Sequence, residues 1–374
     1  MSGQAGSARP GKFIGLMSGT SMDGIDAALV SFPTGRVEIH ATHSMPYPDD
    51  LRHRVCRLSQ NQGTPDDIGE VDHAIGELFA LTACGLLEKS HTTAAEVAAI
   101  GSHGQTIRHQ PRHIAPFSMQ IGDPNLIVEK TGITTITDFR RRDMAAGGEG
   151  APLVPAFHRA FFGSSEEDRC ILNLGGIANI SWLPAGSPES ASGFDTGPAN
   201  ALLDAWSLDQ TGRPFDEDGH WASEGKVNRE LLDDMLTDAY FAQHPPKSTG
   251  KEKFNLSWIR TVVQRHPDIP PADIQRTLLA LTVQTIVDQL PENTAVTIYA
   301  CGGGVRNSLL FDELAHAIQP RTLRSTAELG LDPQWVEASA FAWLAKQTLE
   351  GKTGNLPGAT GARGSRILGA IYLP

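Results

Sequence analysis

The segment from Phe13 to Val30 constrains the fold of this chain most, because two apolar runs flank a turn of small and hydroxylated residues. The pattern predicts a strand, a tight loop and a second strand. Gly19 and Gly24 supply the permissive backbone that such a loop needs. Backbone N–H groups in a loop of this kind can point inward at an anion. The segment therefore predicts either a phosphate-binding loop between two strands or a plain glycine-rich β-hairpin. Hydroxyl groups are added by Ser18, Thr20 and Ser21.

Length and charge narrow the class of protein. A chain of 374 residues predicts two domains, since a single core rarely grows so large. The apolar share of 40% and the 38 glycines suit a soluble α/β protein. The net charge of −12 argues against a nucleic-acid partner, which needs a basic face. The basic run at 140–142 is too short to supply one.

The four cysteines lie far apart, in apolar surroundings and without a CxxC pair. This usage favours buried thiols in a reducing cytosol over disulfides, so we expect a cytoplasmic protein. Residues 1–11 lack the apolar centre of a secretory signal. No run reaches the roughly 20 apolar residues that a membrane span requires, so no membrane association is expected.

The rest of the first half reads as a sheet with covering helices. A third strand at 37–42 would complete an antiparallel meander. A long helix is predicted from Thr64, whose hydroxyl suits the N-cap, to Lys89. A short buried strand at 97–101 then delivers residues 102–106 to its carboxyl end, where ligands bind in open α/β sheets. Further elements are expected at 48–58 (helix), 133–137 (strand) and 153–162 (helix).

The second half repeats this plan. Residues 170–182 again read as strand, glycine turn and strand, which suggests that the two halves are related. We expect Leu323–Ser325 to be the last strand of the sheet and the tail at 351–364 to be irregular. The other predicted elements are helices at 201–208, 271–290, 308–318 and 335–346 and a strand at 296–300.

Three glycine turns follow apolar strands, at 19–24, 175–176 and 302–304. The last precedes a predicted helix, whose N-terminus would add positive potential next to a phosphate or a purine. Any one of these turns is weak evidence for a ligand-binding site, because glycine turns are often only structural. Their distribution over both halves predicts a nucleotide held from two sides.

Asp195 lies in the motif Phe-Asp-Thr-Gly-Pro, ahead of a predicted helix. It is either the N-cap of that helix or a general base that takes a proton from a bound water or hydroxyl. His103, with His109 and His113, fits no usual zinc spacing, so hydrogen bonding to a polar ligand is the better interpretation. An arginine of the 140–142 run is either solvated or a clamp for a carboxylate or phosphate. Glu337 is either on a wet helix face or turned toward the ligand.

Seven motifs, in order, resemble those of the bacterial anhydro-N-acetylmuramic acid kinases. Their order along residues 13–362 makes the resemblance far more specific than any single glycine loop. The motifs are Gly15–Asp26, Gly101–Thr106, Asn173–Asn179, Phe194–Pro198, Pro246–Gly250, Cys301–Gly304 and Leu331–Glu337.

The resemblance implies the actin/hexokinase/Hsp70-like ATPase fold, with two related domains at 12–160 and 161–374 closing on ATP and Mg²⁺. It also implies a homodimer. Many relatives in the wider superfamily have an aspartate at the end of the first strand, where this chain has Met17 and Ser18. Whether Asp23 or Asp26 organises the Mg²⁺ water shell is therefore open. The implied ATP-binding residues are Gly19, Thr20, Ser21, Met22, Asp23, Gly24, Ile25, Asp26, Gly175, Gly176, Gly302, Gly303 and Gly304.

The substrate implied is 1,6-anhydro-N-acetylmuramic acid, whose O6 is locked to C1. As a hypothesis, Asp195 takes a proton from a water attacking C1, and the departing O6 attacks the γ-phosphoryl group of ATP. Arg140, His103 and Gln105 would bind the lactyl carboxylate and N-acetyl group, and Glu337 would also face the sugar. Two alternatives stay open: an ordinary sugar hydroxyl kinase of the same fold, and a non-catalytic nucleotide switch.

Overall fold

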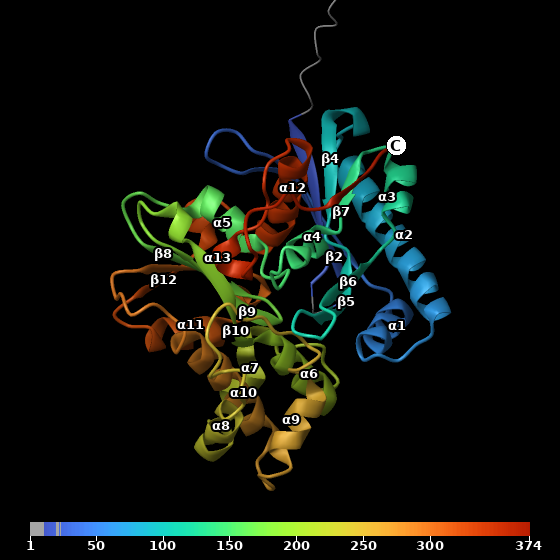
Figure 1. Cartoon of the computed structure of the whole chain (residues 1–374). Helices are drawn as coiled ribbons and strands as arrows, with labels where there is room; N and C mark the ends of the chain where they lie inside the picture. Colours follow the sequence, from blue (N-terminus) through green and yellow to red (C-terminus); the bar gives the residue numbers. More distant parts are fainter. Residues whose placement is uncertain (1–10, 20–21, 23) are drawn as a thin grey trace, which may run out of the picture.

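The computed structural model describes residues 11–19, 22 and 24–374 of the chain (Figure 1). It is a mixed α/β structure with two main sheets, one built largely from each half of the sequence, as expected. Thr20, Ser21 and Asp23, which the sequence assigned to ATP or metal binding, lie outside the described residues. None of the described helices is long and apolar enough to cross a membrane.

In the described chain, the first sheet has six strands in the order β13-β7-β4-β1-β2-β3. β1, β2 and β3 pair antiparallel, which confirms the predicted meander. On the other side of β1, β4 and then β7 add in parallel. The strands are β1 (Lys12–Met17), β2 (Gly24–Ser31), β3 (Glu38–Pro46), β4 (Val97–Ser102), β7 (Thr135–Thr137) and β13 (Ala370–Tyr372).

The second sheet has five strands within the described residues, in the order β10-β9-β8-β11-β12. Its first three strands again form an antiparallel meander, and two parallel strands again follow on the far side of the first. This shared topology supports the hypothesis that the two halves are related. The strands are β8 (Arg169–Leu174), β9 (Ile177–Leu183), β10 (Ser192–Pro198), β11 (Thr297–Cys301) and β12 (Thr322–Ser325).

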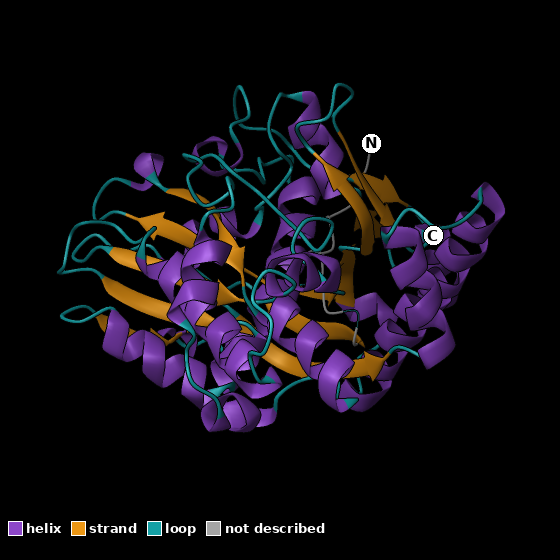
Figure 2. Ribbon diagram, turned by 90° about the horizontal axis from the view of Figure 1, so that it is seen from below, coloured by secondary structure: helices purple, strands orange, loops and turns teal. Residues whose placement is uncertain are grey.

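Helices cover both sheets (Figure 2). The long helix predicted from Thr64 is α2, and Thr64 and Asp67 form a capping box at its start. The run at 138–143 that follows β7 is largely helical and belongs to α4. The helices are α1 (Asp49–Ser59), α2 (Pro65–Ser90), α3 (Pro124–Thr131), α4 (Phe139–Ala145), α5 (Val154–Phe162), α6 (Asn200–Thr211), α7 (His220–Glu224), α8 (Arg229–Leu236), α9 (Leu256–Val263), α10 (Pro271–Val287), α11 (Ser308–Ala317), α12 (Val336–Leu349) and α13 (Pro357–Thr360).

Three apolar cores lie between the sheets and the helices that cover them. One lies between the first sheet and helices α1, α2 and α3, and another between the second sheet and helices such as α6, α8 and α10. The third contains α12 and α5 and joins residues of both sheets, from Phe13 and Ala99 to Ile171 and Tyr299. Because this middle core touches both sheets, it fixes how the two halves face each other.

Two glycines let α12 pack directly on the first sheet. A Cβ at Gly15 would lie 1.7 Å from the carbonyl oxygen of Ala338, and one at Gly101 would lie 2.1 Å from that of Phe341. These two glycines are register partners on β1 and β4. Only glycine allows so close an approach of a helix backbone, and the packing sets the position of Glu337 in the first turn of α12.

The end of the chain returns to the first sheet. β13 pairs antiparallel with β7, so the expectation that Leu323–Ser325 forms the last sheet strand is wrong. A strand of three residues leaves little pattern in a sequence. The division into domains at residues 160 and 161 stays a prediction, and this return of β13 was not part of it. A further hairpin, β5 (Gln105–Gln110) and β6 (Phe117–Ile121), was also not predicted.

Candidate active site

The three glycine turns follow the carboxyl ends of β1, β8 and β11, as the sequence predicted. Below the first of them, Ser18, Tyr47 and Gln105 form a buried polar group. The Ser18 hydroxyl lies 2.7 Å from Oε1 of Gln105 and 3.0 Å from the Tyr47 hydroxyl. Ser18 Oγ also lies 3.2 Å from the carbonyl oxygen of Gly24. Gln105 therefore supports the start of the loop after β1 through its side-chain hydrogen bond with Ser18.

Two predicted ATP-binding residues of this loop turn their side chains into the protein. Met22 and Ile25 are buried and belong to the core under the first sheet. Their side chains are therefore unavailable to a nucleotide, and only their backbone groups can contribute. Met22 has a positive φ of 56°, and its N–H donates to the carbonyl oxygen of Gly19 at 3.4 Å.

The buried His103 and the half-buried Arg140 form a pair on the first-half side. Nε2 of His103 accepts from Nη2 of Arg140 at 2.8 Å, and its Nδ1 lies 3.2 Å from the carbonyl oxygen of Ser18. Burial, and then the charge of Arg140, lowers the pKa of His103 to about 3. His103 is therefore neutral, and its hydrogen bonds direct the guanidinium. A second hydrogen bond, from Nη1 to the carbonyl of Gly150, completes that orientation.

Arg140 faces the carboxylates of the site. Burial lowers its pKa, while Asp195, Glu337 and Asp143 raise it in that order. Its Nε has no hydrogen-bond partner among the described residues. A buried donor without a partner costs free energy, so this N–H suits an anionic or carbonyl oxygen of a ligand.

Asp195 is a strand residue, because it lies within β10 and not at the start of α6. The register of β10 with β9 shifts between Asp195 and Gly197, and bulges of this kind often re-aim side chains at active sites. Oδ2 of Asp195 accepts from the N–H of Thr249 at 3.0 Å, and the Tyr240 hydroxyl donates to its backbone carbonyl at 2.7 Å. The N-cap alternative is thus excluded.

The environment of Asp195 favours its neutral form. Burial raises its pKa to about 7, against the hydrogen bond from Thr249 and the charge of Arg140, which lower it. Glu149 and Glu252 raise it further. A carboxyl group that titrates near neutral pH is suited to act as a general base.

Glu337 and Asp26 lie close enough to interact electrostatically, and Asn173 donates a hydrogen bond to Glu337. Burial raises the pKa of Glu337, Arg140 lowers it and Asp26 raises it. The Ser44 hydroxyl donates to Asp26 at 2.5 Å. Glu337 is half-buried in the first turn of α12, within reach of the charge of Arg140. The described residues contain no group of three or more His, Cys, Asp or Glu that could hold a metal ion.

The two glycine turns of the second half have different structural roles. The carbonyl oxygens of Gly175 and Gly176 accept from the first N–H groups of α6 and its N-cap, so this turn is tied to the helix. Gly302 has a φ of +85°, and a Cβ there would lie 2.4 Å from Oδ1 of Asn173. A Cβ at Gly303 would meet nothing within 4 Å. Gly303 is therefore free of packing demands and open to a ligand.

A family model described as "Anhydro-N-acetylmuramic acid kinase" matches residues 11–374. The chain belongs to this family. A relative of that name from Coxiella burnetii (strain Dugway 5J108-111) is 48% identical over 366 residues, which cover 96% of this chain and 97% of the relative. Relatives of the same name from Saccharophagus degradans and Xylella fastidiosa are 46% and 48% identical, over 98% and 96% of this chain and 100% and 96% of theirs.

Several residues close to the candidate site were not selected as candidates from the sequence. Lys247 is 1% exposed, and its Nζ lies over the rings of Tyr240 (4.9 Å) and Phe194 (5.9 Å) without a hydrogen-bond partner among the described residues. Burial lowers its pKa, and the charge of Asp195 opposes this. The motif Pro246–Gly250 carried the resemblance and was the available signal for Lys247. Glu149 had no signal beyond its position in a glycine-rich run.

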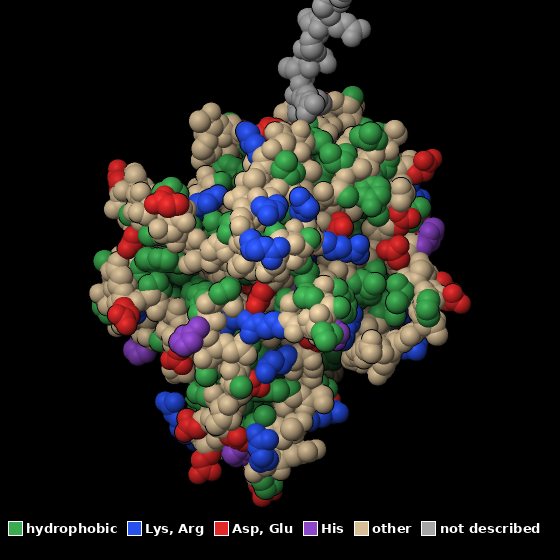
Figure 3. Space-filling model, in the orientation of Figure 1, with side chains coloured by type: hydrophobic (Ala, Val, Ile, Leu, Met, Phe, Trp, Pro, Cys, Tyr) green, Lys and Arg blue, Asp and Glu red, His purple; other side chains and the backbone are tan. Residues whose placement is uncertain are grey.

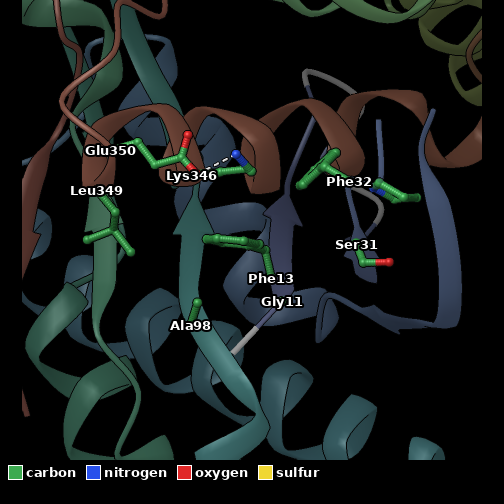
Figure 4. Close-up of a pocket in the computed structure, with 9 residues that line it drawn as sticks. Gly11, Phe13, Ser31, Phe32, Ala98, Lys346, Leu349 and Glu350 are labelled. Atoms are coloured by element: carbon green, nitrogen blue, oxygen red, sulfur yellow. Dashed lines mark hydrogen bonds and ion pairs between the residues drawn. The ribbon is translucent and has the colours of Figure 1, made fainter. Parts of the chain in front are cut away.

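Basic side chains and a cavity lie outside the cluster of candidate residues. On the face in Figure 3, Lys and Arg side chains gather across the middle of the molecule. A cavity of about 410 Å³ lies at the amino end of β1, opposite the end that carries the site. Figure 4 shows Phe13, Phe32 and Leu349 at this cavity, beside the ion pair of Lys346 and Glu350. This cavity is therefore separate from the catalytic candidates.

Proposed function

We propose that this chain phosphorylates 1,6-anhydro-N-acetylmuramic acid with ATP, opening the anhydro ring with water and releasing N-acetylmuramic acid 6-phosphate and ADP. Its role would be the recycling of peptidoglycan sugars in the cytoplasm. Family membership over residues 11–374 supports the substrate. The observation that carries the chemistry is the buried carboxyl of Asp195, with a pKa of about 7 and the charge of Arg140 close by.

Asp195 is the proposed general base. It takes a proton from a water molecule, whose oxygen forms a bond to C1 while the bond from C1 to O6 breaks. The electron pair of that bond stays on O6, which attacks the γ-phosphorus of ATP as ADP leaves. Transfer of the phosphoryl group thus takes the place of protonation of the leaving oxygen.

Arg140 and Glu337 are the proposed sugar-binding groups. The unpartnered Nε–H of Arg140 suits the lactyl carboxylate of the substrate. His103 orients Arg140, and Gln105 acts one step further away, through Ser18 and the loop above it. This changes the proposed role of Gln105 from direct sugar binding to support.

The proposed ATP site joins the loop after β1 to the glycine turns of the second half. Backbone N–H groups around Gly19 and Gly24 would contact the phosphates, and Gly303 would lie against the nucleoside. Mg²⁺, when bound, neutralises charge on the transferring phosphoryl group. It is usually held by one or two carboxylates with phosphates and water, which fits Asp26, whose charge raises the pKa of Glu337. Asp23 remains the second proposed residue, and a homodimer is the proposed assembly.

The test is ADP release with Mg-ATP and 1,6-anhydro-N-acetylmuramic acid, beside free N-acetylmuramic acid. Turnover with the anhydro sugar alone is the expected result. Turnover with the free sugar alone would instead identify an ordinary hydroxyl kinase, and no turnover with either would identify a nucleotide switch. The phosphorylated product, analysed by mass, must contain one oxygen from ¹⁸O-labelled water, because water adds to C1.

A further inference from the structure

The turn between β5 and β6 reaches across to the second half of the chain. Arg112, in this turn, donates from Nη1 to Oε1 of Gln243 at 2.6 Å and from Nη2 to the carbonyl oxygen of Pro246 at 3.0 Å. Its Nε donates to Oε1 of Glu149 at 2.9 Å. One guanidinium therefore joins three segments that are far apart in the sequence, and its planar fork suits several acceptors at once.

Glu149 adds a second connection to the same loop. Its Oε1 faces Arg112, and its Oε2 accepts from the Ser248 hydroxyl at 2.5 Å. The backbone of Glu149 is itself fixed, because its N–H donates to the carbonyl of Thr360 at 2.7 Å. The side chain of Glu149 is 14% exposed, whereas that of Arg112 is 51% exposed, so the carboxylate is largely buried and the guanidinium lies over it from the solvent side.

Pro246 and Ser248, which Arg112 and Glu149 hold, are next in the chain to the two residues that hydrogen-bond to Asp195. Thr249, next to Ser248, donates its N–H to Oδ2 of Asp195 at 3.0 Å. Lys247, on the other side of Ser248, accepts from the N–H of Asp195 at 3.2 Å through its carbonyl oxygen. A shift of Ser248 would therefore move both backbone contacts of Asp195 together.

We propose that Arg112 and Glu149 are positioning residues, which hold loop 243–249 so that Asp195 points at the attacking water. The inference rests on the proposed role of Asp195 as the general base. Arg112 and Glu149 come from the first half, whereas Asp195 and its loop come from the second. The contacts therefore couple the orientation of the base to the fit between the two halves, and the base is fully oriented only when the halves meet.

Two variants test the proposal without touching Asp195. Arg112→Ala removes all three contacts, and Ser248→Ala removes one contact without changing a charge. We expect Arg112→Ala to lower kcat roughly 10- to 100-fold, since small misplacements of catalytic groups cost this much. The KM for ATP should stay within about twofold, because no contact of Arg112 reaches the proposed ATP-binding residues. Ser248→Ala should show a smaller loss of kcat.

The pH profile separates positioning from general stability. The groups that act on the carboxyl of Asp195 are Thr249, Arg140, Glu149 and Glu252, and the Lys247 and Tyr240 side chains are influenced by its charge. The N–H of Thr249 lowers the pKa of Asp195. If Ser248→Ala loosens this hydrogen bond, the pKa rises and the acid limb of the kcat profile moves to higher pH. A purely structural loss would lower kcat equally at all pH values.

Matched controls are Arg36→Ala, in the exposed turn between β2 and β3, and Ser223→Ala, an exposed serine on α7. Both should match the wild type in kcat and pH profile. Arg112→Lys, which keeps the charge without the fork, should recover only part of kcat. Wild-type kcat in Arg112→Ala, or an unmoved acid limb in Ser248→Ala, would overturn the proposal. An inactive Asp195→Asn beside fully active Arg112→Ala would reject this inference and leave the base assignment standing.

Discussion

The two sides of the site hold buried titratable groups in opposite ways. On the first-half side, His103 has a pKa of about 3 and stays neutral while it accepts a hydrogen bond from Arg140. On the second-half side, Asp195 has a pKa of about 7 and can exchange a proton near neutral pH. Burial is the largest cause in both cases and disfavours the charged form of each group.

The difference assigns different tasks to the two halves. A histidine locked in its neutral form serves as a fixed hydrogen-bond partner, and it carries no proton through the reaction. The carboxyl of Asp195, with a pKa of about 7, can change its protonation near neutral pH. We infer that the first half orients the sugar, whereas the second half supplies the base. Four predictions test this division.

The largest expected effect comes from Asp195→Asn. An amide cannot take the proton of the attacking water, so turnover should fall by about 10² to 10⁴, the usual contribution of a general base. In the wild type, kcat should rise with pH through about 7, because the carboxylate is the active form. Steady-state ADP release between pH 5.5 and 8.5 measures both effects. ATP binding, measured by calorimetry, should stay near that of the wild type.

At alkaline pH, Asp195→Asn should have a higher free energy of unfolding than the wild type. The folded-state pKa of about 7 lies above the ordinary value of 3.8, so the folded protein binds this proton more tightly than the unfolded chain. The stability that the proton provides is present below pH 3.8 and is lost as pH rises to about 7. Asparagine avoids this loss. Asp233→Asn, an exposed aspartate on α8, is the control; unchanged turnover in Asp195→Asn would show that another group is the base.

The features that could be predicted from the sequence are those determined by residues close together in the chain. The strand, loop and strand at 13–30 were readable because alternating apolar runs and glycines lie side by side in the chain. The helix from Thr64 was readable for the same reason, since its capping box spans four residues. The choice of Asp195 as a candidate base stays a prediction, and its position within β10 could not be predicted, because the helix that follows it made an N-cap equally reasonable.

The parts that could not be predicted depend on contacts between distant segments. The carboxyl of Asp195 is set by Thr249 and Arg140, 54 residues after it and 55 before it in the chain. No local pattern encodes such pairs. Arg112 lies in a hairpin turn that reads as an ordinary polar loop, and its three partners become visible only in the folded chain. The three-residue strand β13 is too short to leave a periodic signal.

A smaller effect is expected for His103→Gln, which tests whether this residue is held neutral. The variant should be less stable than the wild type by about 1–3 kcal/mol at pH 7.5, because Arg140 and the Ser18 carbonyl lose a well-placed partner. The folded pKa of about 3 lies below the ordinary 6.5, so the stabilisation from neutral His103 is lost as pH falls through that range. The difference in stability should therefore narrow at pH 4.5.

Urea unfolding at pH 7.5 and pH 4.5 gives the two differences for His103→Gln. His53→Gln, exposed on α1, serves as the control and should show no change at either pH. A difference that stays constant between the two pH values would mean that His103 does not resist protonation in the folded protein. The contrast between the two sides of the site would then fail.

The smallest effects concern the glycine turn after β11, where packing and ligand contact are carried by adjacent residues. Gly302→Ala should lower stability by about 1–3 kcal/mol, because φ is +85° and the new Cβ would lie 2.4 Å from Asn173. Gly303→Ala should leave the unfolding midpoint unchanged, since its Cβ would meet nothing within 4 Å. It should instead raise the KM for ATP a few-fold if the nucleoside lies against it. A changed midpoint with an unchanged KM in Gly303→Ala would place the nucleoside elsewhere, and the second half would then contribute the base without this part of the nucleotide site.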